Sequence, residues 1–78
     1  METPKIAQTL DDMGTLLEVR GENPFRCRAY HTAAQALRGL PSDLGPMFVD
    51  GTLAELPGVG ETIYKKIVEL ATTGRLES

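Results

Sequence analysis

One stretch decides the fold of this chain: Leu56-Pro57-Gly58-Val59-Gly60-Glu61-Thr62-Ile63-Tyr64-Lys65-Lys66-Ile67. Pro57 ends a preceding helix, and Gly58 and Gly60 can take backbone angles that other residues avoid, so the chain can turn sharply there. A new helix then begins, in which apolar residues recur at helical spacing: Ile63, Ile67 and Leu70. The stretch therefore predicts two helices joined by a tight glycine turn.

The same turn is a candidate phosphate site. The first amides of a helix have no partner within it, and a turn without side chains lets a phosphate oxygen approach them. This is the logic of a helix-hairpin-helix motif, which holds a nucleic acid by its backbone without contacting base edges. Gly58, Val59 and Gly60 would offer the amides here. The alternative is a turn that only joins two packed helices, but such a turn needs one glycine and this one has two.

Length and composition limit the possible functions. The chain has 78 residues, which predicts a single small domain over residues 1–78 and leaves no room for a polymerase or a dinucleotide-binding core. With 41% hydrophobic residues and few aromatic ones, we expect a globular domain without a deep ligand cavity. Cys27 has no partner for an internal disulfide, and no apolar run has the length of a secretion signal or a membrane span. We expect a cytoplasmic monomer.

Charge is distributed unevenly along the chain. Eight basic and eleven acidic residues give a net charge of −3, which is the wrong sign for strong nonspecific DNA binding. Residues 1–19 and residues 39–60 each carry −3, residues 61–78 are neutral overall, and residues 20–38 carry +3. Any face that binds anions must therefore draw on residues 20–38.

Local signals predict a long first helix. Thr3 is placed as its N-cap, Pro4 as its first residue and Gly21 as its stop. Four apolar residues at helical spacing should face the core: Ile6, Leu10, Met13 and Leu17. The adjacent carboxylates of Asp11 and Asp12 are expected to face water rather than hold a metal, because no further ligand falls one turn away.

A second helix is predicted from Pro24 to Arg38, with Asn23 as its N-cap and Gly39 as its stop. Its buried side should carry Tyr30, Ala33, Ala34 and Leu37, with Cys27 at the margin as a small buried hydrophobe. Its solvent side should carry Arg28, His31, Gln35 and Arg38. We expect His31 to be a surface residue with no partner for a ligand site.

Shorter helices are expected after residue 40. A cap at residues 40–43 precedes a short helix from Leu44 to Val49, and residues 52–55 match a capping box before a single helical turn. The last helix is expected from Glu61 to Thr73, with Gly74 as its stop. The predicted fold is all-α, a compact bundle of four to five short helices that contains one helix-hairpin-helix motif.

Arg26 and Tyr30 are four residues apart and so adjoin on one face of the second helix. A guanidinium beside a phenol hydroxyl suits a terminal phosphate, because the arginine can make a bidentate ionic contact and the tyrosine a hydrogen bond. The alternative is an ordinary buried tyrosine with the arginine stem lying over it. Spacing alone favours this second arrangement.

The chain resembles the amino-terminal domain of X-family DNA polymerases such as DNA polymerase beta. Three runs carry the resemblance, which covers essentially the whole chain: Asn23-Pro24-Phe25-Arg26-Cys27-Arg28-Ala29-Tyr30-His31-Thr32-Ala33-Ala34, Leu56-Pro57-Gly58-Val59-Gly60 and Thr73-Gly74-Arg75-Leu76. The resemblance implies a helical domain that binds the 5′-phosphate side of nicked or gapped DNA in base excision repair, either before a polymerase domain or as a free-standing relative. In some members the same domain is a lyase that removes a 5′-deoxyribose phosphate.

Position by position, the resemblance places the Schiff-base lysine of the lyase on Lys66 and the 5′-phosphate contacts on Arg26, Tyr30 and Thr62. Most departures from the family's pattern remove positive charge or hydrogen-bonding capacity: Thr62 replaces a lysine, Phe25 a histidine, Thr32 a basic residue and Ser78 a lysine. The family also holds a monovalent cation, K⁺ or Na⁺, through backbone carbonyls of the hairpin. Here those carbonyls belong to Ala54, Leu56 and Val59.

Three functional hypotheses follow. The first is a sequence-independent DNA-binding module, in which Arg26, Tyr30, Thr62, Lys65 and Lys66 surround the amides of the hairpin.

The second hypothesis is a lyase. A lysine amine attacks an aldehyde only when neutral, and about one lysine in a thousand is neutral at its ordinary pKa near neutral pH. Lys66 borders the apolar face of its helix, where burial favours the neutral amine, and Glu69 lies one turn away, where its carboxylate favours the charged amine.

The third hypothesis is a degenerate hairpin that contacts protein, because Glu61 at the helix start would repel a phosphate.

Overall fold

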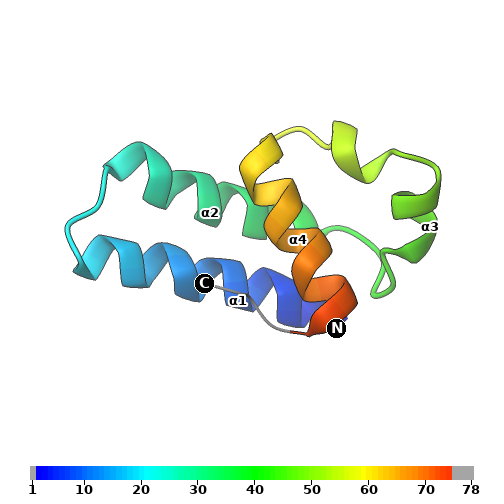
Figure 1. The fold of residues 1–78 in the computed structure, drawn as a ribbon, viewed down its shortest axis with the longest axis horizontal. Helices are drawn as coiled ribbons and strands as arrows, with labels where there is room; N and C mark the ends of the chain where they lie inside the picture. The colour runs from blue at the N-terminus through cyan, green and yellow to red at the C-terminus, as the bar shows by residue number, and fades with distance from the viewer. Residues whose placement is uncertain (1, 75–78) are drawn as a thin grey trace.

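The computed structural model describes residues 2–74 (Figure 1). This part of the chain contains four α-helices and one 3₁₀ turn, joined by loops. They are α1 (Thr3–Val19), α2 (Pro24–Arg38), α3 (Gly45–Val49), the 3₁₀ turn η1 (Leu53–Glu55) and α4 (Glu61–Thr73). No β-strand occurs within that part, and the predicted all-α class is confirmed. Three residues named above lie outside the described residues: Arg75, Leu76 and Ser78.

The two long helices α1 and α2 run side by side in opposite directions, and α4 crosses them (Figure 1). Helix α3 and the turn η1 lie together at one end of this pair (Figure 1). Apolar side chains from every element meet in one core, to which α3 contributes the partly buried Met47. The large buried members are Ile6, Leu10, Leu17, Tyr30, Leu37, Leu53, Ile63, Ile67 and Leu70. Burying each large apolar side chain contributes about 1.5–3 kcal/mol, so this core is the main source of stability.

The bounds of α2 and α4 are confirmed as predicted. The side chain of Asn23 accepts a hydrogen bond of 2.8 Å from the amide of Phe25, which caps the start of α2. At the end of α4, Gly74 has a φ of +77°, and its amide donates a 2.9 Å hydrogen bond to the carbonyl of Leu70. A left-handed glycine in this position satisfies carbonyls that the helix leaves unpaired.

Thr3 does not cap α1, which corrects the prediction. Glu2 stands at the N-cap position without a side-chain hydrogen bond, and Thr3 is a buried residue inside the helix. Its hydroxyl lies 2.6 Å from the carbonyl oxygen of Pro41 and 2.9 Å from that of Ser42. The hydroxyl hydrogen-bonds to the loop after α2 because that loop folds back over the start of α1. Local sequence does not encode this contact.

The predicted capping box at residues 52–55 is also absent. The Thr52 hydroxyl donates to the Asp50 carboxylate at 2.6 Å, and the Thr52 amide donates to the same carboxylate at 2.9 Å. Because Asp50 accepts both hydrogen bonds, Thr52 folds into an aspartate turn and does not cap η1. The leading element of the hairpin is the predicted single turn.

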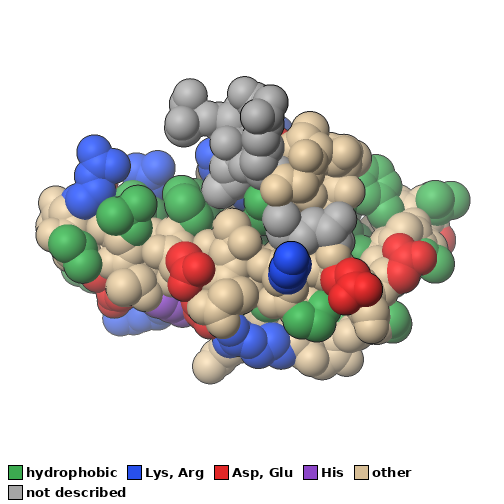
Figure 2. All heavy atoms as spheres, turned by 90° about the horizontal axis from the view of Figure 1, so that it is seen from below, with side chains coloured by type: hydrophobic (Ala, Val, Ile, Leu, Met, Phe, Trp, Pro, Cys, Tyr) green, Lys and Arg blue, Asp and Glu red, His purple; other side chains and the backbone are tan. Residues whose placement is uncertain are grey.

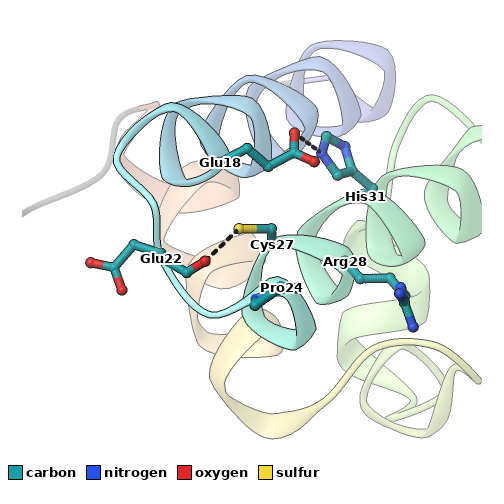
Figure 3. Close-up of a pocket in the computed structure, with 6 residues that line it drawn as sticks. All are labelled: Glu18, Glu22, Pro24, Cys27, Arg28 and His31. Carbon is teal, nitrogen blue, oxygen red and sulfur yellow. Dashed lines mark hydrogen bonds and ion pairs between the residues drawn. The ribbon is translucent and has the colours of Figure 1, made fainter.

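His31, predicted as a surface residue with no partner for a ligand site, is half-buried and contacts two carboxylates of α1. Its Nδ1 atom lies 2.9 Å from Oδ1 of Asp11 on α1. Its Nε2 atom lies 3.2 Å from Oε1 of Glu18 on the same helix (Figure 3). Asp11, which was expected to face water, also lies 2.6 Å from the guanidinium of Arg38. The imidazole fits between the helices because Gly14 leaves space for it: a Cβ atom on Gly14 would lie 2.7 Å from His31 Nε2.

Candidate nucleic-acid interface

The hairpin turn runs from Leu56 to Gly60 and lies against α2. Gly58 has a φ of +89°, which favours glycine, and a Cβ atom there would lie 3.2 Å from the methyl carbon of Thr32. Gly60 differs from the prediction, because its φ of −79° and ψ of 171° are ordinary extended values open to any residue. A Cβ atom on Gly60 would meet nothing within 4 Å. The first glycine is therefore needed for the turn, and the second leaves open space above the start of α4.

Bare amides are present at the start of α4, though not all of those predicted. The Val59 amide donates to the carbonyl of Leu56 at 3.2 Å and so is not free, which corrects one expected donor. Helical hydrogen bonding in α4 starts with the amide of Tyr64, which donates to the Gly60 carbonyl at 2.8 Å. No side chain caps the helix, and within residues 2–74 no partner accepts from the amides of Gly58, Gly60, Glu61 and Thr62. These donors can accept an anion as their partner.

A groove brings together residues of α2 and the start of α4. It has a volume of about 340 Å³ and is lined by Arg26, Ala29, Tyr30, Gly60, Glu61, Thr62 and Ile63. The three side chains that the resemblance assigns to a 5′-phosphate, those of Arg26, Tyr30 and Thr62, thus lie around one space. Arg26 and Thr62 are exposed, so their polar atoms are accessible to a ligand.

Tyr30 combines burial with an unused hydroxyl. Only 2% of the residue is exposed, which agrees with its predicted place on the core side of α2. Its hydroxyl makes no hydrogen bond within residues 2–74. Every fully buried side-chain oxygen or nitrogen in that range has a hydrogen-bond partner, so the Tyr30 hydroxyl is not fully buried. The hydroxyl therefore keeps some contact with solvent, and Tyr30 is one of the residues that line the groove. A buried ring with an open polar tip is a rigid donor toward whatever occupies that groove.

The two lysines of α4 lie beside the groove and do not line it. Lys65 has a side chain that is 74% exposed, and its amine lies 3.7 Å from the Glu61 carboxylate. Lys66 is partly buried, follows Thr62 by one helical turn, and makes no ion pair with a described residue. In particular, Glu69 does not pair with it.

Two further residues of the resemblance lie outside the groove. Phe25 is 76% exposed, and the guanidinium carbon of Arg28 lies 5.8 Å from the centre of its ring. Thr32 contacts the hairpin through its methyl group at Gly58. Glu22 was not among the predicted site residues, yet its carboxylate lies 3.7 Å from the Arg26 guanidinium. The spacing of four residues between an acid and a base was the signal that could have identified this pair.

Charge around the molecule is mixed. Figure 2 shows Lys and Arg side chains interspersed with Asp and Glu side chains on one face, without a continuous basic surface. A second hollow of about 410 Å³, near the turn between α1 and α2, is lined by Glu18, Glu22, Pro24, Cys27, Arg28 and His31 (Figure 3). Its two glutamates make it a poor site for a phosphate, whereas the groove between α2 and α4 adds bare amides to its arginine.

The carbonyls expected to hold a monovalent cation belong to the hairpin. The Leu56 carbonyl accepts a hydrogen bond from the Val59 amide. Within residues 2–74, the carbonyls of Ala54 and Val59 accept no hydrogen bond from a backbone amide of a turn, loop or helix end. Because a carbonyl oxygen has two lone pairs, all three oxygens keep at least one for a ligand. The donor set is therefore compatible with K⁺ or Na⁺, which prefer oxygen ligands.

Two other features are absent from the described residues. No group of three or more His, Cys, Asp and Glu side chains in residues 2–74 could hold a metal ion. No helix in that range is long and apolar enough to cross a membrane.

Comparison with known proteins identifies the family. A family model described as a helix-hairpin-helix domain matches residues 1–76. Comparisons with curated proteins and with solved structures give no match. Helix-hairpin-helix domains commonly bind DNA, which agrees with bare amides at the hairpin. Because the match covers nearly all of the sequence, the chain belongs to the helix-hairpin-helix domain family.

Proposed function

We propose that this domain binds DNA without sequence preference at nicks and gaps, and that the groove between α2 and α4 receives the 5′-phosphate. We further propose that it serves base excision repair as the amino-terminal domain of an X-family DNA polymerase. The observation that carries the proposal is the Tyr30 hydroxyl, which is unpartnered within residues 2–74 and belongs to a side chain that lines the same groove as Arg26 and the start of α4.

The donors of the groove match the chemistry of a terminal phosphate. Arg26 supplies a planar cation, Tyr30 and Thr62 supply hydroxyls, and the first amides of α4 supply aligned N–H groups. All of these donors can be satisfied by phosphate oxygens alone, without a contact to a base edge. Binding should therefore not depend on the DNA sequence. With about two to three phosphate contacts, log K should fall with log salt at a slope of about −2 to −3.

Residue-resolved NMR tests this proposal. An isotope-labelled domain is titrated at low salt with gapped duplexes that differ only in a 5′-phosphate or a 5′-hydroxyl. We expect the largest phosphate-dependent shifts at the amides of Gly60, Glu61 and Thr62 and on the Tyr30 ring. Equal shifts with both duplexes would reject the 5′-phosphate site. Absence of any DNA-induced shift at the hairpin would favour a domain that contacts protein instead.

A lyase is the second candidate, favoured by the position of Lys66. This lysine follows Thr62 by one turn, on the same side of α4, and no described carboxylate holds its amine. Attack of the neutral amine on the aldehyde of an abasic sugar would form a Schiff base with loss of water, and hydride from borohydride would reduce its C=N bond to a stable amine. We expect trapping with wild type and with Lys65→Ala, and loss of trapping with Lys66→Ala. Trapping of Lys66→Ala at the wild-type level would reject Lys66 as the lysine that forms the Schiff base.

The monovalent cation is proposed to bind at the carbonyls of Ala54, Leu56 and Val59 and to bring a DNA phosphate to the hairpin. If so, replacing K⁺ or Na⁺ by a bulky tetraalkylammonium ion at constant ionic strength should weaken DNA binding. Equal affinity in the two salts would exclude a role for the cation.

A further inference from the structure

Two basic side chains near the start of α4, those of Arg26 and Lys65, each have a glutamate partner four residues earlier. Arg26 lies 3.7 Å from Glu22, which belongs to the loop before α2. Lys65 lies 3.7 Å from Glu61, which is the first residue of α4. In both pairs the acid precedes the base, which is the favourable order for such pairs within a helix. Two of the cations that would attract DNA are thus already engaged in the free protein, whereas Lys66 makes no ion pair with a described residue.

Glu61 has a second effect, because it also lines the groove with Arg26 and Tyr30. Its carboxylate stabilises the positive end of the α4 helix dipole, which is the same end that would attract a phosphate. Among the side chains that line the groove, the charge of Glu61 cancels that of Arg26. An incoming phosphate therefore meets a groove without net side-chain charge.

We propose that Glu22 and Glu61 act as an electrostatic brake on DNA binding. In the free protein they hold Arg26 and Lys65 in ion pairs, and DNA binds only when its phosphates take over these two cations. The inference rests on the proposed function, since it concerns the same groove.

Two quantities should change when the brake is removed. Affinity rises, because the phosphate no longer competes with a carboxylate for each cation. The salt dependence becomes steeper, because in wild type a cation from solution returns to each freed carboxylate as DNA releases its own counterions. Each cation that loses its glutamate partner should add up to about −0.9 to the slope of log K against log salt.

The experiment compares Glu22→Gln, Glu61→Gln and the double variant with Glu2→Gln. All three glutamates are exposed, so glutamine should preserve the fold, and circular dichroism checks this. Glu2 makes no ion pair within residues 2–74 and does not line the groove, so its variant measures the effect of net charge alone. Binding is measured on gapped duplexes with a 5′-phosphate and with a 5′-hydroxyl across a salt series.

We expect each single variant to bind the 5′-phosphate duplex about 2- to 5-fold more tightly than wild type, as befits exposed ion pairs. The double variant should bind it about 5- to 20-fold more tightly. Gains no larger than that of Glu2→Gln, or an unchanged salt slope in the double variant, would overturn the brake.

Failure of the brake and failure of the proposed function give different results. If wild type prefers the 5′-phosphate duplex and the variants at Glu22 and Glu61 bind it no more tightly than Glu2→Gln, the phosphate site is supported and the brake is wrong. If wild type binds both duplexes equally, the phosphate site itself is wrong, and the brake falls with it.

Discussion

The Nδ1 atom of His31 on α2 lies 2.9 Å from Oδ1 of Asp11 on α1, and this contact links the two long helices. The pKa of His31 is raised by its hydrogen bonds to Asp11 and then to Glu18, against an opposing effect of burial. The pKa of Asp11 is lowered, chiefly by its hydrogen bond to His31 and, against burial, by Arg38. Charge at one histidine therefore adds to the packing that holds together the helix pair carrying Arg26 and Tyr30.

Stability should consequently fall on both sides of a mildly acidic optimum. A raised folded pKa means that His31 stabilises fully below its unfolded pKa of about 6.5 and that this contribution disappears as pH rises through the folded pKa. Asp11 stabilises above about pH 3.9, and its contribution disappears as pH falls through its lowered pKa. Urea unfolding should show wild type exceeding His31→Gln by up to about 1 kcal/mol near pH 5.5, and by less near pH 8. A difference that does not vary with pH would contradict this.

Gly14 and His31 should be coupled energetically. Alanine is favoured over glycine inside a helix by about 1 kcal/mol, so Gly14→Ala should stabilise the protein by that amount when nothing occupies the space. In wild type the new Cβ atom would lie 2.7 Å from His31 Nε2, and the ring would have to leave Asp11 and Glu18. We expect Gly14→Ala to stabilise a His31→Ala background and to give no gain in wild type. Equal effects in the two backgrounds would mean that the ring and Gly14 do not interact.

Tyr30→Phe should separate binding from folding. The hydroxyl makes no hydrogen bond within residues 2–74, so its removal should change the free energy of unfolding by less than about 0.5 kcal/mol. Loss of a hydrogen bond to a charged phosphate, about 1.5 kcal/mol, should weaken binding of the 5′-phosphate duplex about tenfold. Binding of the 5′-hydroxyl duplex serves as the control and should not change. A large loss of stability would show that the hydroxyl has a structural role instead.

The two glycines of the hairpin should respond differently to alanine. Gly58→Ala places a Cβ atom at a φ of +89° and 3.2 Å from the Thr32 methyl carbon, so it should destabilise the fold by about 1–2 kcal/mol. Gly60→Ala meets neither problem and should leave stability within about 0.5 kcal/mol of wild type. Its methyl group would nevertheless stand beside the bare amides and should weaken DNA binding. Unfolding curves and DNA titrations of both variants check this, and an equal loss of stability would contradict the different roles.

Local chemistry made most of the fold predictable. An asparagine followed by proline starts α2, a glycine ends α4, and apolar residues at helical spacing mark the buried sides of both helices. The signals that failed have tertiary causes. Thr3 serves the loop at Pro41 and Ser42, and His31 finds two carboxylates on a helix that precedes it in the chain. Sequence spacing contains no information about such contacts.

The site was predictable only in part. Spacing placed Arg26 beside Tyr30, and the resemblance added Thr62, but only the folded chain brings α4 against α2 to make a groove. The conformation of Gly60 was not predictable, because a glycine can adopt ordinary angles as readily as unusual ones. The pair formed by Glu22 and Arg26 was accessible from spacing and shows that acids near a candidate anion site need the same attention as bases.

The most direct test of the central claim is the affinity of the unmodified domain for two gapped duplexes that differ only at the 5′ end. Fluorescence anisotropy at one low salt concentration measures both. We predict that the duplex with a 5′-phosphate binds about tenfold more tightly than the duplex with a 5′-hydroxyl, which corresponds to about 1.4 kcal/mol from one charged contact. Equal affinities would contradict the assignment of the groove between α2 and α4 to a terminal phosphate.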